Sequence, residues 1–257
     1  MSDHATALAT NREGWNRVAG FFNGEALPEY GPLAPTEDML GLLDATSGIC
    51  ALELGCGKGH SLLYLAEHGA RELWGLDLSP AQIAYAGETL RPFSPRVRLL
   101  ESPMEVNPGI PESHFDLVFS IYGLGWTTNL AETMRLVAAY LRPGGSFIVS
   151  GEHPAYGCLE WNGTRYVVAR PYGAEGATEH ASWKGVPIVI HRRTVATFVN
   201  AIVQAGLQIE ALVETPVNPG VVKEEHRDPA RWYSVPRAQM MPTTLIVKAR
   251  KCSTAPF

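Results

Sequence analysis

A short apolar run that ends in a glycine turn constrains this chain more than any other feature. Residues 51–60 read ALELGCGKGH, with three glycines at alternate positions and one carboxylate, Glu53, two residues before the first glycine. A short apolar run that ends in glycines is typical of a buried strand. Glycines in the turn that follows let a ligand approach the backbone closely, with amide N–H groups facing it. The pattern therefore predicts a strand–turn–helix unit that binds a ligand.

Predicted strands and helices alternate along most of the chain. Apolar runs predict strands at 49–54, 72–78, 96–102, 115–123, 146–153, 207–214 and 243–250. Helical spacing of apolar residues predicts helices at 60–69, 79–90, 129–141 and 191–206. Such alternation builds a parallel sheet with right-handed crossovers and helices on both faces. We expect one α/β domain over residues 1–257, with seven strands, of which one is antiparallel.

Three long stretches interrupt this alternation and are candidates for lids. Residues 1–45 precede the first strand, 154–190 follow the fifth, and 215–242 separate the last two. Loops of this length in a compact domain are usually lids or binding elements. Because ligands of open α/β sheets bind at the carboxyl ends of the strands, we expect 1–45 to form a lid. The 154–190 stretch is expected to face the substrate, and 215–242 to be a loop.

Composition and charge exclude several classes of function. The net charge of −5 disfavours a nucleic-acid surface, because phosphate binding needs a basic face. No run of 18 apolar residues and no apolar leader segment is present, which predicts a cytoplasmic protein without membrane contact. The four cysteines show no C-x-x-C pair and no metal spacing, so reduced thiols and no metal are expected.

The spacing of the glycines separates two possible ligands. A dinucleotide site usually has G-x-G-x-x-G, whereas Gly55, Gly57 and Gly59 are one residue more compact. Glu53 is unfavourable beside phosphates but suits a cation, and S-adenosylmethionine carries an ammonium and a sulfonium. Asp77 ends the second predicted strand, where an acceptor for ribose hydroxyls belongs for either ligand. Glu53 thus favours S-adenosylmethionine over a dinucleotide.

Four segments in order extend this pattern over residues 45–150. They read LELGCGKG, GLDLS, FDLVFS and LRPGGSFIVS. In sequence and spacing they resemble the class I S-adenosylmethionine-dependent methyltransferases, in particular those that act on small molecules. The resemblance implies a Rossmann-like seven-stranded sheet, S-adenosyl-L-methionine as donor and S-adenosyl-L-homocysteine as product. Such domains occur as monomers and as homodimers, and both states remain open.

The resemblance also assigns donor contacts to individual positions. It implies that Glu53 reaches the methionyl amino group, that Asp77 binds the ribose hydroxyls, and that the glycine turn packs against the methionyl part. Met104 and Glu105 correspond to the turn that contacts adenine, and residues 120–122 to the wall under the sulfonium. The implied donor-binding residues are Glu53, Gly55, Cys56, Gly57, Asp77, Leu78, Met104, Glu105, Ser120 and Tyr122.

One position departs from the family pattern. An acidic residue often precedes the position of Met104 and binds the adenine amino group, but here that residue is Pro103. Glu105, a backbone carbonyl or packing alone could hold adenine instead.

The catalytic residue is harder to derive from the sequence. Methyl transfer is an in-line displacement at an activated carbon, which needs alignment and exclusion of water, and needs a base only if the acceptor must lose a proton early. His153 follows the fifth predicted strand, and the pKa of histidine lies near neutrality, so His153 is the leading candidate for the base. The alternative for His153 is a structural role in which it bonds to a loop carbonyl before Pro154. His191, Glu152 and Tyr122 are alternatives.

Aromatic residues in the three interrupting stretches indicate the kind of acceptor. They favour a lipophilic or ring-containing small metabolite. Candidate acceptor contacts are Tyr30, Trp126, His153 and Trp183. The leading hypothesis is methyl transfer to an oxygen or nitrogen atom of such a metabolite. The alternatives are a non-methylating reaction such as cyclisation on a donor-binding fold, an NAD-dependent oxidoreductase, and a binding module without activity.

Overall fold

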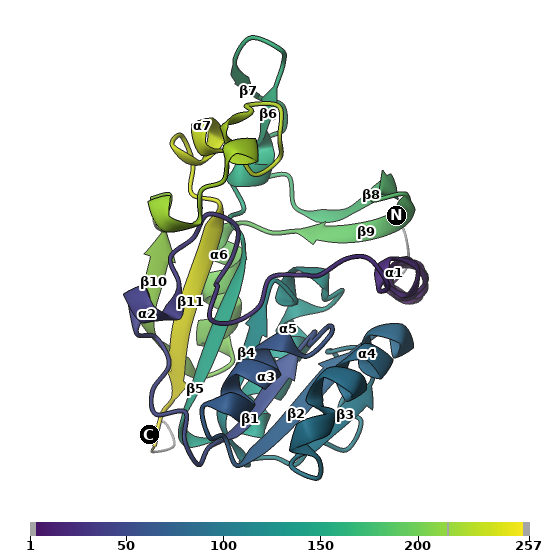
Figure 1. Cartoon of the computed structure of the whole chain (residues 1–257), viewed down its shortest axis with the longest axis vertical. Helices are drawn as coiled ribbons and strands as arrows, with labels where there is room; N and C mark the ends of the chain where they lie inside the picture. The colour runs from purple at the N-terminus through teal and green to yellow at the C-terminus, as the bar shows by residue number, and fades with distance from the viewer. Residues whose placement is uncertain (1–3, 215, 254–257) are drawn as a thin grey trace.

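A seven-stranded sheet forms the centre of the computed structural model, which describes residues 4–214 and 216–253 (Figure 1). Its strands are β1 (Cys50–Leu54), β2 (Glu72–Asp77), β3 (Val97–Glu101), β4 (Phe115–Ile121), β5 (Leu141–Glu152), β10 (Leu207–Glu214) and β11 (Thr244–Lys251). Their order is β10-β11-β5-β4-β1-β2-β3. Strands β1 to β5 pair in parallel, and β11 runs antiparallel to both of its neighbours. The expected fold, with one antiparallel strand, is confirmed.

Four helices cover the two faces of the sheet. They are α3 (His60–Glu67), α4 (Pro80–Leu90), α5 (Leu130–Tyr140) and α6 (Val195–Gln204), with short 3-10 turns at η1 (Arg91–Phe93) and η2 (Leu124–Trp126). Helices α5 and α6 lie on one face of the sheet and α3 and α4 on the other (Figure 1). The side chains of the two pairs pack in separate core clusters. Strand β1 supplies both clusters, because alternate residues point to opposite faces.

Local signals account for the helix starts. The Ser79 hydroxyl accepts a hydrogen bond from the amide of Gln82 ahead of Pro80, the arrangement that its sequence predicts. The helix expected at 191–206 begins later, at Val195. The reason is that β9 continues to Arg192 in pairing with β8, and Thr194 then caps α6.

Two hairpins fill the stretch expected to face the substrate. Its elements are η3 (Tyr156–Cys158), β6 (Leu159–Trp161), β7 (Tyr166–Val168), β8 (Gly176–Trp183) and β9 (Val186–Arg192). The β8–β9 hairpin lies over α1 (His4–Val18), as Figure 1 shows. The amide side chain of Asn11 donates to the carbonyl of Val189 at 2.9 Å and accepts from its N–H at 2.8 Å. A side chain of α1 thereby pairs with the backbone of β9.

The first hairpin instead meets the loop between the last two strands. Within that loop lie η4 (Pro219–Val221), η5 (Glu224–Arg227) and α7 (Val235–Ala238), whereas residue 215 lies outside the described part. The Tyr166 hydroxyl donates to the carbonyl of Pro229 at 2.8 Å and pairs with the Ser234 hydroxyl at 2.8 Å. The two segments therefore form a single cap.

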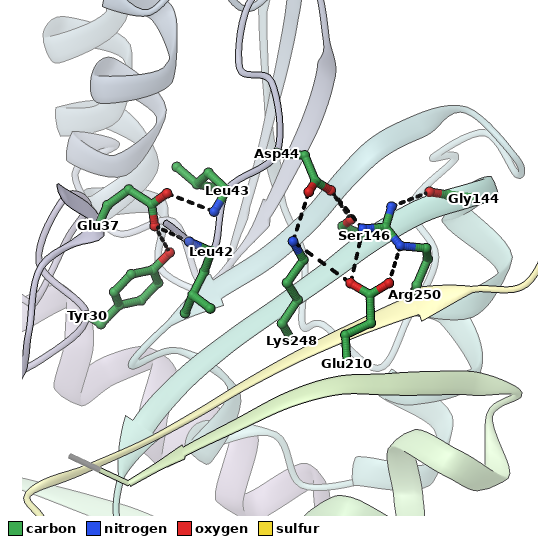
Figure 2. A network of polar contacts seen from close by, with 10 residues as sticks. All are labelled: Tyr30, Glu37, Leu42, Leu43, Asp44, Gly144, Ser146, Glu210, Lys248 and Arg250. Atoms are coloured by element: carbon green, nitrogen blue, oxygen red, sulfur yellow. Dashed lines mark hydrogen bonds and ion pairs between the residues drawn. The ribbon is translucent and has the colours of Figure 1, made fainter. Parts of the chain in front are cut away.

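Polar contacts fix the segment after α1 to the sheet (Figure 2). Within it, Glu37 begins α2 (Glu37–Leu40) and accepts a 2.6 Å hydrogen bond from the hydroxyl of Tyr30. Asp44 accepts hydrogen bonds from Lys248 at 2.9 Å and from Arg250 at 3.0 Å, both on β11. Residues 1–3 of the expected N-terminal lid lie outside the described part. Over the described residues no helix is both long and apolar enough to cross a membrane.

Candidate active site

The glycine turn after β1 is held in left-handed backbone conformation. Gly55, Gly57 and Gly59 have φ values of 71°, 51° and 78°. A Cβ on Gly59 would lie 2.9 Å from a methyl carbon of Leu90, so this glycine lets α4 approach. A Cβ on Gly57 would meet no atom within 4 Å. Gly57 therefore borders open space at the carboxyl end of β1, whereas Gly59 serves packing.

Glu53 is a buried carboxyl group whose bonding is incomplete. Its side chain is 2% exposed in the middle of β1, and Oε2 has no hydrogen-bond partner among the described residues. Burial raises the pKa of Glu53 well above its usual value, the nearby charge of Asp77 raises it further, and a hydrogen bond from Ser61 opposes both. A buried carboxyl group with one unpartnered oxygen fits a cationic ligand.

Asp77 lies over the same turn. It accepts hydrogen bonds from the amides of Gly57 at 2.9 Å and Ser79 at 2.8 Å. Burial raises its pKa to about 6, although these backbone hydrogen bonds act in the opposite direction. Asp77 suits the ribose of either ligand, whereas Glu53 is unfavourable beside the pyrophosphate of a dinucleotide. Together the two carboxyl groups fit a ligand with an ammonium group and a ribose diol, so the chemistry of this cradle suits S-adenosylmethionine.

The other positions with an expected donor role surround this cradle in different ways. Cys56 is buried beside both carboxyl groups, Leu78 is partly exposed, and the methyl carbon of Met104 lies 3.7 Å from where a Cβ on Gly55 would be. Glu105 is engaged elsewhere, because its Oε1 accepts hydrogen bonds from the amide and hydroxyl of Thr128 at 2.8 and 2.6 Å.

Ser120 and Tyr122 lie at the end of β4, next to the turn. The Ser120 hydroxyl donates to the carbonyl of Leu54 at 2.7 Å, which ties the ends of β1 and β4 together. Tyr122 has a φ of 56°, rare for a residue with a side chain, and its hydroxyl pairs with that of Thr244 at 2.7 Å. Strain of this kind persists only where the surroundings fix it.

His153 is 5% exposed and has partners on both ring nitrogens. Nδ1 accepts a hydrogen bond from the amide of Ala155 at 3.2 Å, which leaves the proton on Nε2, 2.7 Å from Oε1 of Glu214 at the end of β10. The ring thus links the ends of β5 and β10 and offers no free lone pair. Its role as a base stays a prediction, and this geometry favours a positioning role.

Glu152, the neighbour of His153 in sequence, has a carboxyl group that is hydrogen-bonded, among the described residues, through only one of its oxygens. Its Oε2 accepts hydrogen bonds from the indole N–H of Trp232 at 2.6 Å and the hydroxyl of Tyr233 at 3.0 Å. Burial raises the pKa of Glu152, and both hydrogen bonds oppose this. Burial is the largest cause of the raised pKa of Tyr233, and the charge of the neighbouring Glu152 is the next largest.

A second acidic group lies close to these residues. Burial and the charge of Glu29 raise the pKa of Glu25 to about 7. Burial is the main cause of the raised pKa of Tyr122, and the charges of Glu152 and Glu25 also raise it. Glu25 and Glu152 therefore both act electrostatically on Tyr122, which follows β4 near the glycine turn.

Arg237 was not found by sequence analysis. Its side chain is 3% exposed, and its guanidinium lies 4.2 Å from the ring centre of Tyr156 and 4.1 Å from that of Trp232. It also donates to the carbonyl of Tyr156 at 2.8 Å. Arg237 stacks on the indole of Trp232, which is close in sequence. The bonds from Arg237 to Tyr156 and from this indole to Glu152 each join residues about 80 positions apart, so no local pattern could signal this site.

The aromatic residues expected to contact the acceptor separate into two places. Trp126 and Trp183 pack with ring centroids 5.8 Å apart, and Trp15 of α1 lies 5.0 and 5.2 Å from them. Phe22 completes this aromatic cluster, 5.5 Å from Trp183. Tyr30, in contrast, is fully buried in the core cluster of α3 and is bonded to Glu37, apart from the aromatic cluster.

Comparisons with known proteins agree with this geometry. A sequence family described as a methyltransferase domain matches residues 51–145. The crystal structure of an S-adenosylmethionine-dependent methyltransferase from Mesorhizobium loti is 30% identical, covers 83% of this chain and 96% of its own, and superposes with a TM-score of 0.67. An uncharacterized protein of Haemophilus influenzae is 31% identical over 83% of this chain and 85% of its own length.

A relative with a named acceptor matches over a shorter part. The malonyl-[acyl-carrier protein] O-methyltransferase of Pectobacterium atrosepticum is 34% identical over 109 residues, which are 42% of this chain and 41% of that protein.

Proposed function

Because this chain belongs to the S-adenosylmethionine-dependent methyltransferases, we propose that it methylates an oxygen or nitrogen atom of a small, aromatic or lipophilic acceptor. The observation that carries the proposal is the pairing of two sites at one sheet edge. One is the cradle of Glu53, Gly57 and Asp77, and the other is the carboxyl group of Glu152. S-adenosylmethionine, when bound, supplies a methyl group on a positively charged sulfur, already activated for displacement.

Donor binding is assigned to residues of β1, β2 and β4. Glu53 would bind the methionyl ammonium through its unpartnered Oε2, and Asp77 would bind the ribose hydroxyls. Cys56 and the glycine turn would pack against the methionyl part, and Leu78 and Met104 against adenine. Ser120 and Tyr122 would form the wall under the sulfonium, where the bond between Tyr122 and Thr244 keeps the wall in place.

Glu152 is proposed as the group that accepts the acceptor proton. Both of its side-chain hydrogen bonds go to Oε2. Oε1 lies beside Gly157 and is the oxygen assigned to the acceptor proton in this proposal. The acceptor O–H or N–H bond breaks toward this oxygen while the acceptor atom takes the methyl group, and the proton then passes to solvent. The aromatic cluster of Trp15, Trp126 and Trp183 would give the acceptor an apolar wall that excludes water.

Two measurements test the donor and the reaction. S-adenosylhomocysteine should raise the melting temperature of the protein, and NAD should not. With labelled S-adenosylmethionine and a pool of small metabolites, the product should gain one methylene in mass while S-adenosylhomocysteine accumulates. Stabilisation by NAD alone would contradict the proposal, and a product isomeric with its substrate, formed without consumption of the donor, would establish a non-methylating reaction.

Donor affinity should depend on pH through Asp77. Burial raises the pKa of Asp77 to about 6, so its side chain becomes protonated as the pH falls below 6. The charged form, which accepts hydrogen bonds from the ribose hydroxyls in this proposal, is then lost. We expect S-adenosylhomocysteine affinity, measured by calorimetry, to fall by up to about tenfold per pH unit there. Asp77→Asn should bind more weakly at pH 8 and lose this dependence. Equal affinity of the wild-type protein at pH 8 and pH 5 would exclude the ribose role.

Replacement of His153 should affect stability more than turnover. His153→Ala removes the partner of Glu214 and the acceptor for the amide of Ala155, at a cost of about 1–3 kcal/mol in the free energy of unfolding. We expect kcat to change by less than about tenfold, well below the loss expected of a base. A loss of kcat by orders of magnitude at unchanged melting temperature would return the catalytic role to His153.

A further inference from the structure

Three metal-ligating side chains meet at the edge of the sheet opposite the candidate active site. Cys50 and Glu72 are the first residues of β1 and β2 and are register partners, and His114 directly precedes β4. The strands lie side by side in the order β4-β1-β2. One thiol, one carboxylate oxygen and one imidazole nitrogen all lie within 4.8 Å of one another.

Two of the three ligand–ligand distances are close to the edges of a tetrahedral metal site. Cys50 Sγ lies 3.6 Å from Oε2 of Glu72, and Nε2 of His114 lies 3.1 Å from the same oxygen. Usual zinc–ligand bond lengths and tetrahedral angles give about 3.6 Å for a sulfur–oxygen edge and about 3.4 Å for a nitrogen–oxygen edge. The third pair, Cys50 Sγ and the imidazole nitrogen of His114, lies within 4.8 Å, against about 3.6 Å for a sulfur–nitrogen edge, so a zinc ion would draw these two side chains together around the Glu72 oxygen.

Neighbouring groups orient the three ligands. The indole N–H of Trp74 donates to Oε1 of Glu72 at 2.8 Å, which turns Oε2 toward Cys50 and His114. Asp116 accepts the amide of Cys50 at 2.7 Å and fixes the start of β1. Such partners hold metal ligands in position in known sites. The side chains of Glu72 and His114 are 24% and 33% exposed, so an ion can enter and water can supply a fourth ligand.

We propose that Cys50, Glu72 and His114 bind one Zn²⁺ ion that ties the starts of three strands together. Thiolate, imidazole and carboxylate are the ligands that zinc prefers. On binding, the Cys50 thiol releases its proton to solvent, neutral His114 provides the lone pair of Nε2, and the two anionic ligands balance the charge of the ion.

Arg71 is the competitor for this site. Its guanidinium donates to Cys50 Sγ at 3.0 Å, so a cation already faces the sulfur. The Arg71 side chain is exposed and can turn into solvent. Removal of this guanidinium should thus favour the ion, which distinguishes a metal site from a network of hydrogen bonds.

Titration of the full-length, chelator-treated protein with Co²⁺ tests the proposal. One equivalent should give a thiolate-to-cobalt charge-transfer band and the visible bands of tetrahedral cobalt, and one equivalent of Zn²⁺ should remove them. Zn²⁺ should also raise the melting temperature by several degrees. Absence of the charge-transfer band in the wild-type protein would overturn the proposal.

Variants assign the ligands. Cys50→Ser should abolish the charge-transfer band, and His114→Gln, at the partly exposed rim, should weaken binding at least about tenfold. Arg71→Ala should bind Co²⁺ more tightly than wild type. Cys252→Ser, which changes an exposed free cysteine, should match wild type in binding and in stability. Wild-type Co²⁺ binding by His114→Gln that retains its melting temperature would also overturn the assignment.

Discussion

Replacement of Gly57 by asparagine is expected to weaken S-adenosylhomocysteine binding by at least about 100-fold while the fold stays intact. A Cβ at this position would meet no protein atom within 4 Å, so the new side chain would enter the space proposed for the donor. Asparagine tolerates the left-handed conformation that Gly57 adopts at a φ of 51°. Binding measured by calorimetry and melting temperature measured without ligand separate the two effects.

Gly41 provides the matched control. It has a φ of 58°, follows α2, and also has no atom within 4 Å of a would-be Cβ. Gly41→Asn places the same side chain in the same backbone conformation away from the cradle, and should bind the donor as wild type does. Normal affinity in Gly57→Asn, or equal losses in both variants, would refute the position of the donor.

Replacement of Glu152 by glutamine should lower kcat by about 10²–10⁴-fold, the usual contribution of a general base. The amide keeps the size of the side chain and can still contact Trp232 and Tyr233. Donor affinity should therefore remain that of wild type. A change in donor affinity with little change in kcat would instead place Glu152 in the donor site.

The pH profile gives an independent test of Glu152. Burial raises its pKa, and a base must be ionised to act, so the rate should fall as the pH drops through this raised value. Tyr233→Phe removes a hydrogen bond that stabilises the charged form, and should shift the acidic limb of the profile to higher pH. An acidic limb that is unchanged in both Tyr233→Phe and Glu152→Gln would exclude Glu152 as the titrating group.

Local sequence signals predicted the strands and helices around the proposed donor cradle well. The strand with Glu53, the glycine turn and Asp77 lie within 30 residues, and their positions follow from strand periodicity and turn chemistry. Cap signals such as Ser79 before Pro80 were equally reliable because a cap depends only on its own turn. Residues close in sequence needed no knowledge of the rest of the chain.

The acceptor side could not be predicted in the same way. His153 and Glu152 are adjacent in sequence, and only their tertiary partners distinguish their roles. The ring of His153 is bonded to Glu214, whereas Glu152 is bonded to Trp232 through one of its two oxygens. The proposed metal ligands show the same limit. Cys50 and Glu72 are 22 residues apart, and Glu72 and His114 are 42 apart, so sheet order alone brings them together.

The paired bonds between Asn11 and Val189 join segments that are 178 residues apart. During synthesis α1 leaves the ribosome long before β9 exists. These two hydrogen bonds can therefore form only after the residues of the donor cradle have been synthesised.

Helix α1 also supports the donor cradle, because Asn16 accepts a hydrogen bond from the hydroxyl of Ser79 at 2.7 Å, and the amide of Ser79 donates to Asp77. If Trp15 and Trp183 line the acceptor site as proposed, exchange of α1 together with the β8–β9 hairpin between relatives would move that wall as one unit. Asn16 would have to be kept so that the support of Asp77 is unchanged.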